Sequence, residues 1–379
     1  MKILMVISQF HPAIVGGTEK QALSLSRTLV DSGAEVRVLT QRTQGLPANE
    51  LISGIKVDRE IRTLRFGFLY GITYILSSLF YFVRNRRRYD IIHCHHLYLC
   101  AAAAVITAGL FSKKVAVKIA CTGEYSDIRC MRNMRGGPLL LWIAKKADIF
   151  FAISDETVKE LLETGINENK IIKIPNFVDT AVFMPAADEV KKELKIRLNL
   201  PLNGPIVISC GRLVRQKGPE FLLQAWHMAK MEGLPGHLIM LGDGILKKEL
   251  EEKIKALGLS ESVTLRGDRQ DVPDFLRAAD IFVLASLAEG MSNALLEAMS
   301  SGLACIATKI GGNTDLIRHN ADGILVSPAS PEEIHAGLKT LLLNPMRARG
   351  FGESMALKIK QHYSLDRVTS EYLKLYERL

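Results

Sequence analysis

The chain has 379 residues, of which 48% are hydrophobic and 23% charged, a composition that excludes a disordered or low-complexity protein. The length predicts two domains. The net charge of +9 is uneven, because residues 1–185 hold 24 Lys and Arg against 16 Asp and Glu, whereas residues 186–379 hold 25 against 24. The first half is therefore expected to meet an anionic partner, which could be a membrane surface, a phosphorylated substrate or a nucleic acid.

The chain opens on an apolar run, residues 2–7, that is too short for the hydrophobic region of a signal peptide and is typical of a first strand. The six cysteines are scattered and include no C-x-x-C pair, so neither a zinc site nor a disulfide framework is indicated. Both features predict a cytoplasmic protein.

Short β-branched runs alternate with segments of helical period from end to end. The predicted strands are 2–7, 35–40, 91–95, 115–121, 149–154, 171–175, 206–210, 237–241, 262–265, 281–285, 304–307 and 323–326, and the predicted helices include 19–31, 155–163, 219–231, 246–257 and 331–343. Buried strands joined by helices form parallel sheets. A polar, proline-bounded stretch at 186–203 separates the two series, so we predict two α/β domains divided at residue 185/186.

Two adjacent glycines, Gly16 and Gly17, follow the first predicted strand and open a helix. They could close over a ligand phosphate or simply form a tight turn.

The segment 66–83 carries no charge over eighteen residues and is followed by Arg84, Arg86, Arg87 and Arg88. One stripe at helical spacing is aliphatic and another is rich in Tyr, Thr and Ser. Aromatic residues beside a basic run are typical of a helix that lies on an anionic membrane. A plain core helix and a membrane span are the alternatives, and a span would cut the first domain in two.

A metal site is not expected. His93, His95 and His96 cluster at one strand end, but no Cys or carboxylate accompanies them at metal-ligand spacing. The sequence also holds no D-x-D pair for a nucleotide-bound Mg²⁺ or Mn²⁺.

The segment from Gly211 to Gly218 lies between a predicted strand and a predicted helix and contains Arg212 and Lys217. Glycines allow close backbone approach, and the two cations near a helix N-terminus suit a diphosphate. A solvated basic loop is the alternative.

A second acidic and glycine-containing segment follows the strand predicted at 281–285. Glu289 lies in the loop, Ser292 or Asn293 can cap a helix, and Glu297 falls in its second turn, where it could bind vicinal hydroxyls such as those of a ribose. The free amides of residues 290–294 would offer an anion site. For Glu289 alone, favourable interaction with the helix dipole is the alternative.

These motifs, together with Asn176-Phe177-Val178-Asp179, resemble the retaining glycosyltransferases of family 4, also called group 1, over the whole length. The resemblance implies an α/β fold of the GT-B class: two Rossmann-like, doubly wound parallel-sheet domains facing across a cleft. Residues 1–185 would bind the acceptor, residues 186–364 would bind the nucleotide-sugar donor, and the helix at about 365–379 would pack back on the first domain. Carried over by resemblance, the catalytic and donor-binding residues are Gly16, Gly17, Gly211, Arg212, Lys217, Glu289, Gly290, Met291, Ser292, Asn293 and Glu297.

The chain departs from the family in its first domain. Many relatives have a His before a glycine after the fifth strand, where this chain reads Cys121-Thr122-Gly123-Glu124. Thr122, Glu124 and His95 are the acceptor-side candidates, and the Arg84–Arg88 run is the membrane candidate. Phe177, where glycine is usual, is a smaller departure.

The resemblance predicts a retaining, metal-independent hexosyl- or N-acetylhexosaminyltransferase of cell-surface polysaccharide or glycolipid biosynthesis, with a UDP-sugar favoured and no cofactor. Its expected partners are the donor, a glycan or lipid-linked acceptor and an anionic membrane, the last placing it peripherally on the inner face of the cell membrane. Nucleic acid is not expected, because the basic excess lacks a recognised motif. The alternatives are a nucleotide-sugar epimerase or hydrolase on the same fold, and a catalytically silent, membrane-docked nucleotide-sugar-binding module.

Overall fold

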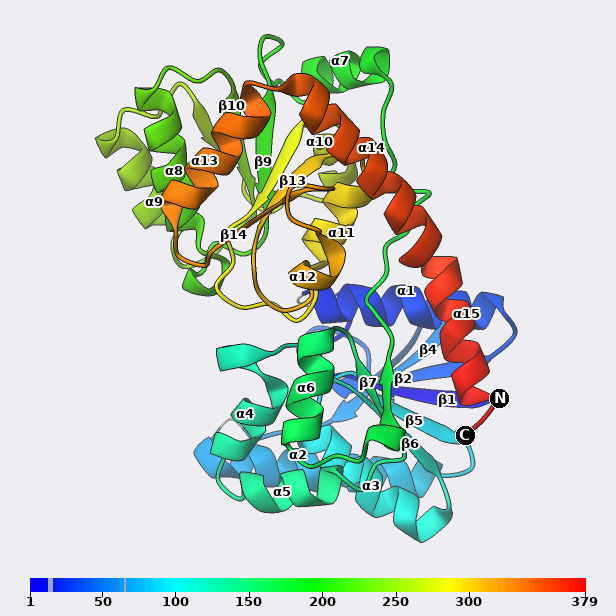
Figure 1. Cartoon of the computed structure of the whole chain (residues 1–379). Helices are drawn as coiled ribbons and strands as arrows, with labels where there is room; N and C mark the ends of the chain where they lie inside the picture. Colours follow the sequence, from blue (N-terminus) through cyan, green and yellow to red (C-terminus); the bar gives the residue numbers. More distant parts are fainter. Residues whose placement is uncertain (13–15, 65) are drawn as a thin grey trace. The chain divides into compact units, whose positions relative to one another are not determined.

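The computed structural model describes residues 1–12, 16–64 and 66–379, and the side chains of Phe68 and Glu124 lie outside that description. The chain divides into two compact units. Unit 1 comprises Met1–Asn176 and Leu365–Leu379, and unit 2 comprises Phe177–Ser364 (Figure 1). Each is an α/β unit built on its own sheet, as the alternating sequence pattern predicts.

Unit 1 contains an eight-stranded sheet in the order β3-β4-β2-β1-β5-β6-β7-β8, parallel except for the antiparallel pair β3 and β4. Its strands are β1 Lys2–Val6, β2 Glu35–Gln41, β3 Asn49–Ile52, β4 Ile55–Ile61, β5 Ile91–Cys94, β6 Lys114–Lys118, β7 Ile149–Ala152 and β8 Ile171–Lys173. Its helices are α1 Gly17–Asp31, α2 Gly67–Asn85, α3 Leu99–Phe111, α4 Asp127–Asn133, α5 Gly137–Ala144, α6 Asp155–Glu163 and α15 Leu365–Tyr376, with short 3₁₀ turns η1 Gly123–Tyr125 and η2 Glu168–Lys170.

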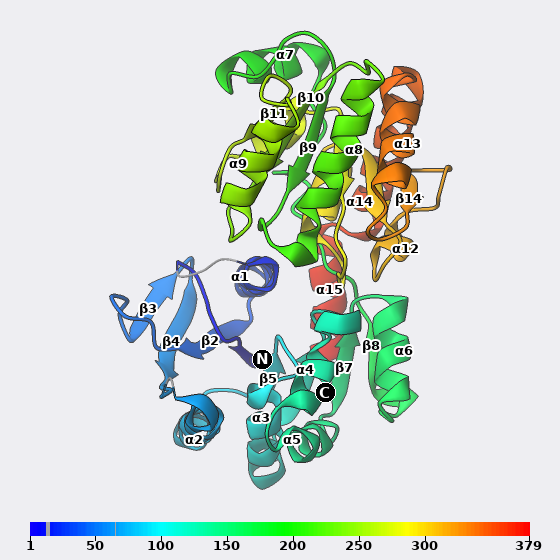
Figure 2. The same cartoon turned by 90° about the vertical axis from the view of Figure 1, so that its left-hand side faces the viewer.

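The two faces of this sheet are covered by different helices. Helices α1 and α15 pack against each other on one face, whereas α2, α3 and α5 cover the other (Figures 1 and 2). The layer of α2, α3 and α5 forms a large apolar core with the sheet, in which alternate residues of the strands contact helix residues such as Tyr81, Phe82 and Ala104. The continuous apolar strands of the sequence are thus buried on both sides.

The hairpin of β3 and β4 was not among the predicted strands. β4 carries four charged residues, which weaken the apolar signal of a strand. In the structure these charges are paired. Asp58 accepts hydrogen bonds from Arg37, at 2.8 Å, and from Tyr81. Arg59 donates to the carbonyl of His11 at 2.6 Å and forms an ion pair with Glu50.

Unit 2 contains a six-stranded, wholly parallel sheet in the order β11-β10-β9-β12-β13-β14. Helices α8, α9 and α13 lie on one face and α11 and α14 on the other (Figures 1 and 2). Its strands are β9 Ile206–Cys210, β10 His237–Leu241, β11 Val263–Leu265, β12 Ile281–Leu284, β13 Ala304–Thr308 and β14 Ile324–Val326. Its helices are α7 Asp188–Arg197, α8 Pro219–Met231, α9 Lys247–Ala256, α10 Val272–Ala278, α11 Asn293–Ser300, α12 Asn313–Leu316, α13 Pro331–Leu342 and α14 Pro345–His362, with the 3₁₀ turn η3 Arg215–Lys217.

The division between the units falls at Asn176/Phe177, earlier than the expected position at 185/186. Residues after 176 already belong to unit 2, because Phe183 accepts a hydrogen bond from Ser300 at 2.5 Å. The polar stretch at 186–203 contains α7, whose Lys191 forms an ion pair with Asp280 at 2.5 Å.

Beneath α15, unit 1 buries an unusual group of basic side chains. The ring of His93 stacks on that of His95 with centroids 4.4 Å apart, and Tyr376 of α15 lies 2.6 Å from Nδ1 of His93. Burial lowers the pKa of His93 to about 3 and that of Lys118, on the neighbouring strand, to about 7. Unit 1 therefore holds three neighbouring basic groups whose charged forms are disfavoured by burial.

Lys118 should lower the stability of the protein at neutral pH. Its ordinary pKa of 10.5 falls to about 7 in the folded state, so the unfolded chain binds more protons between these values and stability rises with pH there. Lys118→Met is expected to raise the free energy of unfolding at pH 7, and the gain should shrink by about 1.4 kcal/mol per pH unit towards pH 9. Denaturant unfolding at both pH values measures this gain. Lys114→Met, on the same strand and half exposed, is the control and should show no such trend.

Candidate functional site

The sheet of unit 2 has a topological switch point between β9 and β12. The chain runs from β9 to β10 on one side of the sheet and later returns to place β12 on the other side of β9. The loops after these two strands therefore leave the same sheet edge in opposite directions, which is where doubly wound proteins bind ligands. Both donor-site segments of the sequence analysis are these two loops.

The loop after β9 requires glycine where it enters α8. Gly218 caps α8 with φ of +58°, and a Cβ at that position would lie 2.3 Å from the carbonyl oxygen of Ala285, just after β12. A side chain there would meet both a left-handed backbone and a backbone clash. Gly218 therefore allows the two loops to approach closely.

Hydrogen bonds join these loops along their length. The amide of Leu287 donates to the carbonyl of Gln216 at 2.8 Å, and the side chain of Gln216 donates to the carbonyl of Ala288 at 3.1 Å. Lys217 Nζ lies 2.6 Å from Glu289 Oε1, which also accepts from Ser286 Oγ at 2.7 Å. The ammonium of Lys217 is thus held in position by a carboxylate that is itself mostly buried.

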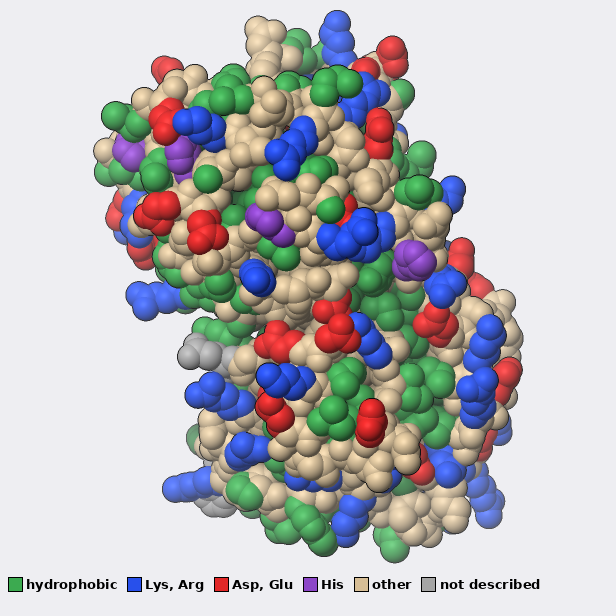
Figure 3. Space-filling view, in the orientation of Figure 1, with side chains coloured by type: hydrophobic (Ala, Val, Ile, Leu, Met, Phe, Trp, Pro, Cys, Tyr) green, Lys and Arg blue, Asp and Glu red, His purple; other side chains and the backbone are tan. Residues whose placement is uncertain are grey.

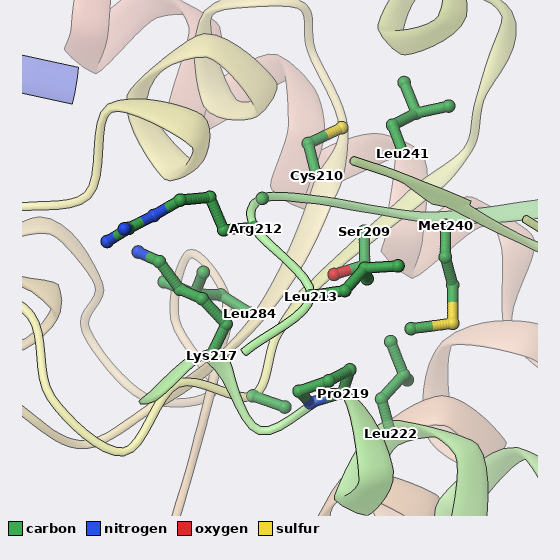
Figure 4. A pocket seen from close by; sticks show the side chains of 12 residues that line it. Ser209, Cys210, Arg212, Leu213, Lys217, Pro219, Leu222, Met240, Leu241 and Leu284 are labelled. Atoms are coloured by element: carbon green, nitrogen blue, oxygen red, sulfur yellow. The ribbon is translucent and has the colours of Figure 1, made fainter. Parts of the chain in front are cut away.

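A small, open hollow lies at the ends of β9, β10 and β12. Gly211, Arg212 and Lys217 line it together with apolar residues. Figure 4 shows the side chains of Arg212 and Lys217 extending in the same direction at one end of the pocket. Two cationic side chains that line one pocket, with Lys217 fixed in position by Glu289, favour an anionic ligand.

The second donor segment lies beside this pocket and contributes no lining residue to it. Ser292 caps α11 by accepting from the amide of Leu295 at 3.4 Å, and Gly290 accepts from the amide of Gly312 at 2.6 Å. Met291 and Ser292 are buried, while Asn293 and Glu297 are half-buried on α11. Lys217, through its bond to Glu289, connects the pocket to this segment.

In unit 1 the corresponding switch point lies between β1 and β5. Gly16 and Gly17 begin α1 on the chain that follows β1. On the chain that follows β5, His96 Nδ1 lies 3.6 Å from Asp127 Oδ2, and the His96 side chain is 20% exposed. Burial lowers the pKa of His96, but the carboxylate of Asp127 outweighs that effect and the resulting pKa lies above its ordinary value, with a contribution from Glu19.

Sequence reasoning did not include His96 among the acceptor-side candidates. It chose His95, which the structure buries completely on the sheet face under α15, because residues 93 and 95 alternate onto one side of the strand. Thr122 is buried at the start of η1. The side chain of Glu124 lies outside the described residues. His96 is a partly exposed imidazole beside the buried carboxylate of Asp127 at a switch point. The sequence does not reveal this pair, because only the fold brings the two residues together.

The Arg84–Arg88 run ends α2, on the side of unit 1 opposite α15. Throughout residues 1–12, 16–64 and 66–379, every helix is too short or too polar to cross a membrane. Among the side chains that the structure describes, no three His, Cys, Asp or Glu residues gather as metal ligands would.

Comparison with known proteins identifies the family. The model for glycosyl transferases group 1 matches residues 190–356, and that for glycosyltransferase family 4 matches residues 15–182. A glycosyltransferase of Methanocaldococcus jannaschii is 26% identical over 399 residues, which covers 100% of this chain and 98% of that protein. The UDP-Gal:alpha-D-GlcNAc-diphosphoundecaprenol alpha-1,3-galactosyltransferase of Escherichia coli is 37% identical over 172 residues, 45% of this chain and 43% of that enzyme.

Among solved structures, Anabaena HepE in complex with UDP-glucose matches with a TM-score of 0.82 and 19% identity over 100% of both chains. This likeness and the two parallel sheets define the fold as that of a GT-B glycosyltransferase. The chain belongs to the group 1 glycosyltransferases of family 4.

Gly218→Ala should disrupt the loop pair. The substitution combines a left-handed backbone with a Cβ placed 2.3 Å from the Ala285 carbonyl, so it is expected to destabilise unit 2 by more than the roughly 1–2 kcal/mol of the left-handed conformation alone and to weaken nucleotide binding. Gly233→Ala is the matched control, because Gly233 has φ of +73° with open space around it. Denaturant midpoints and nucleotide titration compare the two variants, and equal losses would contradict the proposed close approach.

Proposed function

We propose that this chain is a retaining, metal-independent transferase that moves a hexosyl or N-acetylhexosaminyl group from a nucleotide-diphosphate sugar to an acceptor hydroxyl. The observation that carries the proposal is the pair of cations at the switch point of unit 2, Arg212 and Lys217, with Lys217 held by Glu289 at 2.6 Å. A donor diphosphate is the ligand that such an arrangement suits best.

In the proposed reaction, the bond between the anomeric carbon and the diphosphate oxygen breaks, and its electron pair stays with the nucleoside diphosphate. Arg212 and Lys217 stabilise the charge that grows on that leaving group, the task often given to a metal ion. The acceptor oxygen bonds to the anomeric carbon on the face the diphosphate left, and the leaving phosphate takes its proton. Glu289 orients Lys217 and contacts the sugar, Glu297 binds the ribose hydroxyls, and the amides of residues 290–293 meet the distal phosphate.

A UDP-sugar is the favoured donor. HepE was solved with UDP-glucose, and the Escherichia coli relative is named for transfer from UDP-Gal to a diphosphoundecaprenol-linked sugar. By analogy we propose a lipid-linked or growing glycan acceptor, bound by unit 1, and a role in cell-surface polysaccharide or glycolipid biosynthesis at the inner face of the cell membrane.

Arg212→Ala and Lys217→Ala should each lower kcat/KM by about 10²–10³, because each removes a cation that stabilises the leaving group. Arg215→Ala removes an exposed cation of the same loop that does not line the pocket and should retain the normal rate. Turnover is measured by release of nucleoside diphosphate from UDP-, GDP- and ADP-sugars with and without acceptor glycans, and NMR of the product gives the anomeric configuration.

Full turnover without acceptor would instead identify an epimerase or hydrolase, and donor binding without turnover would identify a silent binding module. A strict Mn²⁺ requirement after EDTA treatment would contradict metal independence, and an inverted product would contradict retention.

His96 is proposed to orient the acceptor hydroxyl by accepting its hydrogen bond while neutral. His96→Gln should lower kcat on the order of 10²-fold without weakening donor binding. Asp127→Asn should shift the acidic limb of the kcat/KM profile to lower pH, because the carboxylate that raises the pKa of His96 is lost. His362→Gln, an exposed histidine of α14, is the control. An unshifted acidic limb in Asp127→Asn would overturn this role.

A further inference from the structure

Helix α2 packs with its polar side chains inward. Tyr81 hydrogen-bonds Asp58 of β4, Ser77 Oγ accepts from the amide of Arg62 at 2.9 Å, and Thr73 Oγ1 accepts from the amide of Leu64 at 3.0 Å. Tyr74, Tyr81 and Phe82 of the same helix are buried in the core. A second apolar set, Ile72, Leu76, Phe80 and Val83, is exposed on the outer side, and Phe80 is 66% exposed. An ordinary surface helix has one apolar stripe, which faces the core, whereas α2 is apolar on its outer side as well.

The neighbouring helices continue the exposed apolar surface. Helix α3 contacts both α2 and α5, so the three form one layer over the sheet. Leu110 of α3 is 70% exposed and Trp142 of α5 is 57% exposed. We call this surface the outer face; its residues are Ile72, Leu76, Phe80 and Val83 of α2, Ile106 and Leu110 of α3, and Leu139 and Trp142 of α5. Several large apolar side chains on adjacent helices indicate an interaction surface.

Basic side chains accompany the outer face. Residues 61–147 hold 14 Lys and Arg against 3 Asp and Glu. Three cations lie over aromatic rings there: Lys146 at 3.6 Å from the Trp142 centroid, Arg86 at 5.4 Å from that of Phe111, and Arg84 at 5.7 Å from that of Phe80. In Figure 3, hydrophobic and basic side chains are interspersed over α5 at the lower edge. The excess charge of the first half of the sequence therefore lies in the segment that contains α2, α3 and α5, and three of its cations contact aromatic rings of these helices.

We infer that the outer face docks unit 1 onto a lipid bilayer with anionic headgroups. Apolar and aromatic side chains enter the interface between headgroups and acyl chains, while the surrounding Arg and Lys bind lipid phosphates. A second copy of this chain is a poorer occupant, because a symmetric contact would bring two strongly basic faces together. Helix α2 lies on the membrane and keeps its polar side bonded to β4 within unit 1.

The docking deepens the proposed location at the inner face of the cell membrane and rests on it, but it is separable from the transfer reaction, because it uses no residue of the donor site. It specifies three helices of the fold, whereas the sequence pattern indicated residues 66–88 alone. It also predicts that two separate contributions add: apolar insertion, which salt does not weaken, and headgroup attraction, which salt screens.

Vesicle flotation without donor or acceptor tests the inference. The full chain should bind vesicles of equal parts phosphatidylglycerol and phosphatidylcholine, and should bind pure phosphatidylcholine far more weakly. Arg86→Ala/Arg87→Ala/Arg88→Ala should weaken partitioning on the order of 100-fold, from the usual contribution of a basic residue near an anionic surface. The matched control, Lys192→Ala/Lys248→Ala/Lys255→Ala, removes the same charge from exposed positions of unit 2 and should bind nearly as the unsubstituted chain.

Leu76→Ser/Phe80→Ser tests the apolar contribution. Both side chains are exposed, so the fold should be unaffected, while vesicle binding at high salt should be lost. Ile245→Ser/Met231→Ser replaces two exposed apolar residues of unit 2 and should leave binding unchanged.

Tryptophan fluorescence locates the contact directly. The chain has two tryptophans, and Trp226 is fully buried in unit 2, so a blue shift on vesicle addition reports Trp142. Brominated acyl chains should quench Trp142, and Trp142→Phe should abolish both signals. Binding with an unchanged Trp142 spectrum, or equal loss of binding in the unit 2 controls, would overturn the inference. So would self-association in solution that the Leu76→Ser/Phe80→Ser variant abolishes.

Discussion

Unit 2 depends on the contact between the chain that leaves β9 and the chain that leaves β12. Gly218 lets the two backbones approach closely. Gln216 forms hydrogen bonds with both Leu287 and Ala288, and the ammonium of Lys217 pairs with the carboxylate of Glu289. Residues more than seventy positions apart thereby form one rigid surface. A cation fixed by a mostly buried carboxylate needs little reorganisation to meet an anion, which is the basis of electrostatic preorganisation.

Unit 1 is organised differently, because the two faces of its sheet have opposite character. Beneath α15 lie two histidines and a lysine whose charged forms are disfavoured by burial. Beneath α2, α3 and α5 lies an ordinary apolar core, and the unusual chemistry is on the outer side of those helices. The switch point, with Gly16, Gly17 and His96, belongs to the sheet edge and not to either face.

The sequence predicted the twelve main strands, the α/β class and the family, because buried parallel strands and the loops after them leave strong local patterns. It could not decide which stripe of α2 faces inward, since Asp58 and the other polar partners on β4 decide that, not the hydrophobicity of the helix. It missed β4 because the charged residues of this strand interrupt the apolar pattern by which a strand is recognised, and their partners lie in other segments. It named His95 and left out His96, because the carboxylate beside His96 comes from Asp127, a residue that only the fold brings close. Lys118 lies inside an apolar run of the sequence, which gives no sign of its environment. Each miss concerns a residue whose environment is supplied by a distant segment.

The return of α15 to unit 1 has a consequence for the order of folding during synthesis. Residues 1–176 leave the ribosome first, yet the sheet face that carries His93 and Phe151 stays uncovered until Tyr372 and Tyr376 follow, nearly two hundred residues later. Unit 2 is contiguous and can fold as soon as it emerges. The domain made first is therefore finished last, and contacts of very long sequence separation make its final step slow and dependent on the helix that follows unit 2.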